Sequence, residues 1–73
     1  MARIEILAEA TGNVWKVEIQ AGTKVEADTP LIFIESMKME IPVSSLDAGT
    51  VVELRVKEGD AVEEGQVVAV MEC

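Results

Sequence analysis

The stretch that decides the fold is residues 15–20, which read Trp-Lys-Val-Glu-Ile-Gln and alternate apolar with polar side chains. A period of two residues is typical of a β-strand with one buried face. The same alternation returns at residues 52–57, which read Val-Glu-Leu-Arg-Val-Lys. We therefore predict two matching, half-buried strands in this 73-residue chain.

These two stretches belong to an internal repeat with an offset of 37 residues, the separation of Gly12 from Gly49. The other matched pairs are Val14 with Val51, Gly22 with Gly59, Val25 with Val62, Glu26 with Glu63, and Glu35 with Glu72. A repeated unit of this size cannot bury its apolar face alone, so the two halves should pack on each other. We expect a pseudo-twofold axis to relate them.

Each half provides about four short strands, counted from its apolar stretches and glycine turns. Besides residues 15–20 and 52–57, the expected strands are residues 3–7, 40–43, 31–35 and 67–71, with short stretches around Val25 and Val62. No window of about 11 residues shows a helical apolar stripe. The sequence therefore predicts an all-β fold, a flattened eight-strand antiparallel barrel-sandwich with a pseudo-twofold, over residues 1–73 as a single domain.

The alternation in the last strand of each half also predicts which side chains fill the core. Leu31 and Val68 occupy equivalent positions and should point inward, and the same holds for Phe33 and Val70.

Residues 35–40, between the two halves, read Glu-Ser-Met-Lys-Met-Glu. Turns are normally built from Gly, Asn, Asp or Ser, whereas Met prefers a core. The twofold places the chain ends opposite this segment, so Lys38 is predicted at a hairpin tip. In a two-residue type I′ turn, Met37 and Lys38 would both need positive φ, which costs roughly 1 to 3 kcal/mol each. A conflict between local preference and structure indicates a functional site.

These residues resemble the biotin attachment motif of biotin carboxyl carrier domains, which reads Ala-Met-Lys-Met or Ser-Met-Lys-Met after a Glu. From Ile4 through Glu72 the chain resembles the biotinyl/lipoyl domain family, above all its single-domain biotin/lipoyl attachment proteins. The resemblance implies that a biotin protein ligase attaches biotin covalently to Lys38. It also implies that the ligase recognises a frame around the lysine, consisting of Glu35, Ser36, Met37 and Met39.

The resemblance further implies a carrier that is not itself an enzyme. Biotin on Lys38 would carry CO2 as carboxybiotin from a biotin carboxylase to a carboxyltransferase, and the cofactor would hold the chemistry. A lysine amine in water is only about one part in a thousand neutral at pH 7, so a separate ligase must supply an acyl-adenylate. The sequence agrees, because it has no histidine, no cysteine cluster for a metal and no phosphate-binding loop.

Two alternatives remain open. Lipoyl domains share the barrel and the tip lysine but usually have Asp before it and Ala after it. Met37 and Met39 therefore favour biotin, while Glu35 suits either motif, so lipoate or modification by both acids stays possible. The second alternative is an unmodified barrel that serves as an interaction module.

The composition limits the kinds of partner that the protein is expected to bind. Fourteen acidic against six basic residues give a net charge of −8, which repels nucleic acid and anionic lipid. No apolar run approaches the roughly 20 residues that a bilayer requires, and we see no signal peptide. We expect a cytoplasmic monomer that binds neither nucleic acid nor membrane. Cys73, the only cysteine, is expected to be a frayed terminal thiol.

Overall fold

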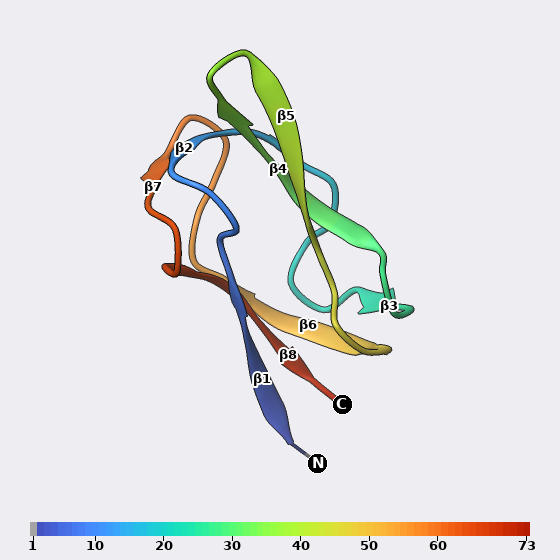
Figure 1. Ribbon diagram of the computed structural model, residues 1–73. Coiled ribbons are helices and arrows are strands. Elements are labelled where there is room, and N and C mark those ends of the chain that lie inside the picture. Colours follow the sequence, from blue (N-terminus) through green and yellow to red (C-terminus); the bar gives the residue numbers. More distant parts are fainter. Residues whose placement is uncertain (1) are drawn as a thin grey trace.

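The computed structural model describes residues 2–73, which form eight β-strands and no helix. The all-β prediction is therefore confirmed. Figure 1 shows the strands wrapped around one another along a long axis. Their bounds are β1 (Arg3–Leu7), β2 (Gly12–Val17), β3 (Lys24–Val25), β4 (Pro30–Ser36), β5 (Met39–Ser44), β6 (Gly49–Leu54), β7 (Ala61–Val62) and β8 (Val67–Glu72).

The strands form two four-stranded antiparallel sheets, in the orders β1-β8-β6-β3 and β5-β4-β2-β7. The first half of the chain supplies β1 to β4 and the second supplies β5 to β8, so exchanging equivalent strands converts one sheet order into the other. The register repeats as well, since Arg3 faces Glu72 across β1 and β8, and Glu40 faces Glu35 across β5 and β4. The predicted pseudo-twofold thus extends to individual residue pairs.

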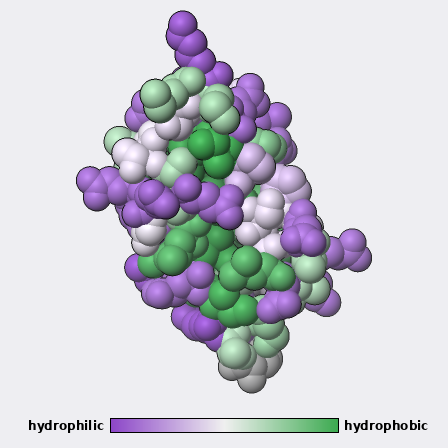
Figure 2. All heavy atoms as spheres, viewed as in Figure 1, coloured by the Kyte–Doolittle hydropathy of each residue, from purple (hydrophilic) through white to green (hydrophobic). Residues whose placement is uncertain are grey.

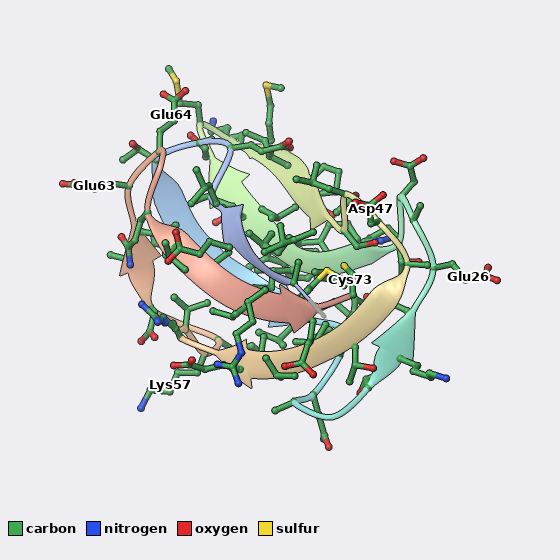
Figure 3. All side chains as sticks on the ribbon, turned by 90° about the horizontal axis from the view of Figure 1, so that it is seen from below. Glu26, Asp47, Lys57, Glu63, Glu64 and Cys73 are labelled. Atoms are coloured by element: carbon green, nitrogen blue, oxygen red, sulfur yellow. The ribbon has the colours of Figure 1, made fainter. Side chains whose placement is uncertain are left out.

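The core lies between the two sheets and is almost entirely aliphatic. Its fully buried side chains include Leu31, Ile32, Ile34, Val14, Val43, Val51, Val68 and Met71. Figure 3 looks along the molecule from the end with the termini, and there Glu26, Asp47, Glu63 and Glu64 point outward around the sheets. Burial of aliphatic surface therefore stabilises the fold, and the acidic residues stay in water.

The prediction for Leu31 and Val68 is confirmed, because neither side chain has any exposed surface. The prediction for Phe33 and Val70 is wrong. Phe33 is only half-buried and lies on the outer face of its sheet, opposite the exposed Pro42. Val70 is buried, but it pairs with Glu5 and Glu53, whose side chains are exposed. Directly paired residues share one face of a sheet, so Val70 also points to the outer face.

The reason is a β-bulge in each half. The pairing of β4 with β5 shifts by one residue between Pro30 and Ile32, so Leu31 and Ile32 both point inward. Inward positions then continue at Ile34, which leaves Phe33 outside. A bulge inserts one unpaired residue and resets the alternation, and a simple two-residue pattern does not reveal it.

The two long strands begin and end three residues earlier than expected. Residues 15–20 and 52–57 were the expected ranges, whereas β2 and β6 are Gly12–Val17 and Gly49–Leu54. The cause is topological, because β2 and β3 lie in different sheets and residues 18–23 must cross between them. The crossing is held where the Gly22 N–H donates to the Val51 carbonyl oxygen at 2.6 Å.

The molecule is elongated, with Cα extents of 36 × 17 × 16 Å. Figure 1 shows the β4–β5 hairpin at one end of the long axis and both chain ends at the other. Beside those ends, the Cys73 N–H donates to the Ala2 carbonyl oxygen at 3.0 Å. Residues 2–73 contain no helix with the length and apolar character needed to cross a membrane.

Candidate functional site

The predicted hairpin tip is a two-residue turn between β4 and β5. Ser36 pairs with Met39, and Met37 and Lys38 lie between them with φ values of 51° and 66°. Positive φ at both central residues is what a type I′ turn requires. Among non-glycine residues of the described chain, only Asp28 shares this conformation, with φ of 63°. The tip therefore adopts the unfavourable backbone that the sequence predicted.

All three side chains at the tip are exposed. Met37 has 93% and Met39 62% of its surface accessible, although both are large and apolar. Lys38 is also exposed, and it takes part in none of the ion pairs found among residues 2–73. At the hairpin end of the molecule, Figure 2 shows a long hydrophilic side chain that extends beyond paler, moderately hydrophobic ones.

The hairpin that carries the tip is anchored in the core. Ile34 is fully buried and pairs with Ile41, and one step further Ile32, also fully buried, pairs with Val43. Packed side chains of this kind fix the backbone and leave a long side chain at the tip free to move. An exposed amine on a rigid corner suits covalent attachment, which needs access to the lysine nitrogen and no enclosing cavity.

The residues predicted to frame Lys38 lie together below the tip. Ser36 pairs with Met39, and Glu35 pairs with Glu40 on one side and Asn13 on the other. The structure thus brings Glu35, Ser36, Met37 and Met39 around Lys38, as the sequence suggested. Their role in recognition by a ligase stays a prediction.

Glu40 is the residue that sequence reasoning left out of this frame. It lies directly across from Glu35, and both side chains are exposed on the outer face of the sheet. The signal was available, because the 37-residue offset aligns Glu40 with Arg3 and so reveals a reversal of charge.

No group of three or more His, Cys, Asp or Glu side chains that could hold a metal ion occurs within residues 2–73. Cys73 is exposed and has a free thiol. It lies at the end opposite Lys38 (Figures 1 and 3). The chemistry-bearing residues at the hairpin end are therefore the tip lysine and the two glutamates below it.

Comparison with known proteins agrees with this geometry. Residues 3–71 match the family model described as "Biotin-requiring enzyme". The "Biotin/lipoyl attachment protein" of Bacillus subtilis is 46% identical over 59 residues, which are 81% of each chain. The "Biotinylated protein TB7.3 homolog" of Mycobacterium leprae is 36% identical over 67 residues, covering 92% of this chain and 94% of that protein.

A solved structure extends the comparison to three dimensions. The crystal structure of Kluyveromyces lactis urea carboxylase superposes with a TM-score of 0.92 at 38% identity. The match covers 99% of this chain but only 6% of the carboxylase, so the similarity concerns one small domain of a much larger enzyme. Fold, tip geometry and relatives agree, and the chain belongs to the biotin/lipoyl domain family as a carrier domain homologous to the biotinyl domains of carboxylases.

Proposed function

We propose that this protein is a biotin carrier and that a biotin protein ligase acylates it on Lys38. The observation that carries the proposal is the tip, where an exposed lysine lies between Met37 and Met39, which are 93% and 62% exposed. Neither water nor the turn favours methionine at these positions. Contact with a partner protein would explain why both exposed positions are methionine.

Biotin would supply the carboxyl-carrying chemistry, and the chain's own residues would only hold the amine. Lys38 would present the attached group to a biotin carboxylase and then to a carboxyltransferase. The buried Ile34 and its partner Ile41 keep the corner rigid while the modified side chain moves. Tethering raises the effective concentration of the group at each active site, so contacts with both enzymes can stay weak and transient. The carrier itself would be a non-catalytic monomer.

A lipoyl carrier is the second candidate. Glu35 suits either attachment motif and so is compatible with lipoate, and the name of the similar Bacillus subtilis protein includes both acids. Biotin remains the first choice because Met37 and Met39 occupy the positions where lipoyl domains usually have Asp and Ala.

Intact-mass analysis tests the proposal. Purified protein is incubated with ATP and biotin plus a biotin protein ligase, and separately with ATP and lipoate plus a lipoate ligase. We expect a single biotin adduct, and peptide mapping should place it on Lys38. Lys38→Arg should abolish the adduct, whereas the control Lys24→Arg, on strand β3, should not. A lipoyl adduct alone would favour the second candidate. Labelling on another lysine, or no labelling, would contradict the carrier role of Lys38.

A further inference from the structure

Both aromatic residues of the chain, Trp15 and Phe33, lie outside its core. Trp15 is 43% exposed, and its ring centroid is 6.2 Å from that of the half-buried Phe33. Pro42, also exposed, faces Phe33 from the next strand. We call Trp15, Phe33 and Pro42 the aromatic face; it spans the outer surface of β2, β4 and β5.

The pseudo-twofold provides an internal control for this face. The positions equivalent to Trp15, Phe33 and Pro42 in the other half are occupied by Val52, Val70 and Glu5. The opposite sheet adopts the same register without any aromatic residue. Since the fold does not need the aromatic face, its presence on the sheet that carries Lys38 has another explanation. Trp is moreover enriched among the residues that dominate binding energy at protein interfaces.

The glutamates below the tip differ from their counterparts in a second way. Glu35 and Glu40 oppose each other across β4 and β5, and the residues in the equivalent positions are Glu72 and Arg3. Arg3 Nε lies 3.4 Å from Glu72 Oε2 in an ion pair. Directly opposed like charges destabilise a sheet. The sheet that carries the tip therefore holds two carboxylates where the other sheet holds an ion pair.

The other ion pairs show that this reversal is local. Lys16 Nζ lies 3.0 Å from Glu18 Oε1, and at the equivalent positions Arg55 Nε lies 3.2 Å from Glu53 Oε1. The acidic and basic residues have exchanged places between these two pairs, but each pair still joins opposite charges. Within residues 2–73, Glu35 and Glu40 are thus the only counterpart of an ion pair that lacks a cation.

The order along the hairpin joins the two features. Moving away from Lys38, the pairs are Ser36 with Met39, Glu35 with Glu40, and then, on the same outer face, Phe33 with Pro42. Figure 1 shows β4 and β5 running side by side down from this tip. A protein that covers Lys38 from this side meets the two carboxylates first and the aromatic face next.

We propose that the aromatic face and the Glu35–Glu40 pair together form the docking surface for the ligase that acylates Lys38. The partner would insert a cationic side chain, an arginine above all, between the two carboxylates, and would cover the aromatic face with an apolar patch. Arginine suits this position because its planar fork binds carboxylates with two hydrogen bonds. The inference rests on the proposed function, and it adds four residues to the surface that the ligase recognises, namely Trp15, Phe33, Pro42 and Glu40.

Steady-state acylation kinetics with a purified biotin protein ligase, ATP and biotin test the charged part. Glu40→Arg recreates the Arg3–Glu72 arrangement, so the fold should be at least as stable as the wild type in urea. Recognition should nevertheless fail, with KM for the carrier raised about tenfold or more and kcat little changed. The matched control is Glu5→Arg, which makes the same change of charge on the exposed outer face of the other sheet.

The apolar part is tested in the same assay with Trp15→Thr, for which Val52→Thr at the equivalent position is the control. We expect KM to rise about tenfold for Trp15→Thr and to stay near the wild-type value for the control. If Trp15→Thr fails to fold, Phe33→Leu replaces it, because that change removes the aromatic ring and keeps an apolar side chain.

Wild-type KM for both Glu40→Arg and Trp15→Thr would overturn the docking surface, and so would an equal rise in the two controls. Normal acylation of both variants, followed by loss of carboxyl transfer with a carboxylase, would assign the surface to that enzyme and also overturn the proposal. Failure of the proposed function gives a different result, since the wild-type protein itself would then not be labelled on Lys38.

Discussion

Gly12 lies so close to the main chain of Glu35 that a Cβ atom on Gly12 would overlap the Glu35 carbonyl oxygen. The equivalent Gly49 meets Glu72 in the same way, since a Cβ there would lie 2.6 Å from the Glu72 carbonyl oxygen. Close backbone approach, and not a turn, therefore requires glycine at these two positions. One of them, Gly12, lies against the hairpin close to the tip that carries Lys38.

We expect Gly12→Ala to lower the free energy of unfolding by about 1 to 3 kcal/mol, because main-chain atoms have little room to move away from an added methyl group. Urea denaturation followed by tryptophan fluorescence measures the change. Asn13→Ala, an exposed change at the next residue, should stay within about 0.5 kcal/mol of the wild type. An equal effect of the two substitutions would contradict the close approach.

The tip should gain stability when its residues are replaced by the preferred turn sequence. Asn and Gly adopt positive φ readily, so Met37→Asn combined with Lys38→Gly should raise the free energy of unfolding by about 1 to 3 kcal/mol. Thermal and urea denaturation provide the measurement. Labelling by the ligase should be lost at the same time. The double variant should thus be more stable but unable to accept the cofactor, because the residues needed for attachment are not those that the turn prefers. Unchanged or lower stability would argue against strain at the turn.

Asp28 and Gly65 are equivalent residues that share positive φ, at 63° and 86°. Their N–H groups also make equivalent bonds, each 2.9 Å long, to the carbonyl oxygens of Ser45 and Ala8. Since Asp is accepted at one position, Gly65→Asp should lower the free energy of unfolding by less than about 1 kcal/mol, whereas Gly65→Val should lower it by more, because a β-branched residue rarely adopts this conformation. Urea denaturation of the two variants measures both changes. Equal losses of stability would refute the equivalence of positions 28 and 65.

Ser45 is buried, and its hydroxyl bridges a loop. Ser45 Oγ accepts from the Thr29 N–H at 3.1 Å and donates to the Glu26 carbonyl oxygen at 2.6 Å. In the other half the residue is Ala8, and there the Gln66 N–H donates directly to the Glu63 carbonyl oxygen at 3.0 Å. The loop can therefore close without the hydroxyl.

On this basis Ser45→Ala should destabilise the protein by only about 1 kcal/mol, the typical net value of one hydrogen bond. A loss well beyond this, measured in urea, would mean that the Thr29 N–H stays unpaired in the variant, since the Glu26 carbonyl oxygen still accepts from Thr29 Oγ1 at 2.7 Å. Ser44→Ala, at a half-buried neighbour, serves as the control.

Much of the fold could be predicted because the repeat supplies the same information twice. The alignment of Gly12 with Gly49 and Glu35 with Glu72 predicted the number of strands, the pseudo-twofold and the position of the tip. Positive φ at Met37 and Lys38 was also predictable, since a two-residue hairpin turn leaves few backbone alternatives. Local chemistry and topology sufficed for these features.

What could not be predicted depends on contacts between strands that are distant in sequence. The bulge at Leu31, which places Phe33 outside the core, arises from pairing with β5 and leaves no trace in the alternation. The opposition of Glu35 and Glu40, by contrast, was overlooked although a two-residue turn at Met37 and Lys38 places these residues opposite each other. Both features belong to the face that we assign to partner recognition.

The position of residues 2 and 73 side by side, at the end of the 36 Å axis remote from the tip, has a practical consequence. Anchoring the protein to a bead or a sensor chip through either end should leave the amine facing the solution. The same molecule could then serve as an immobilised acceptor for following a single ligase turnover in real time.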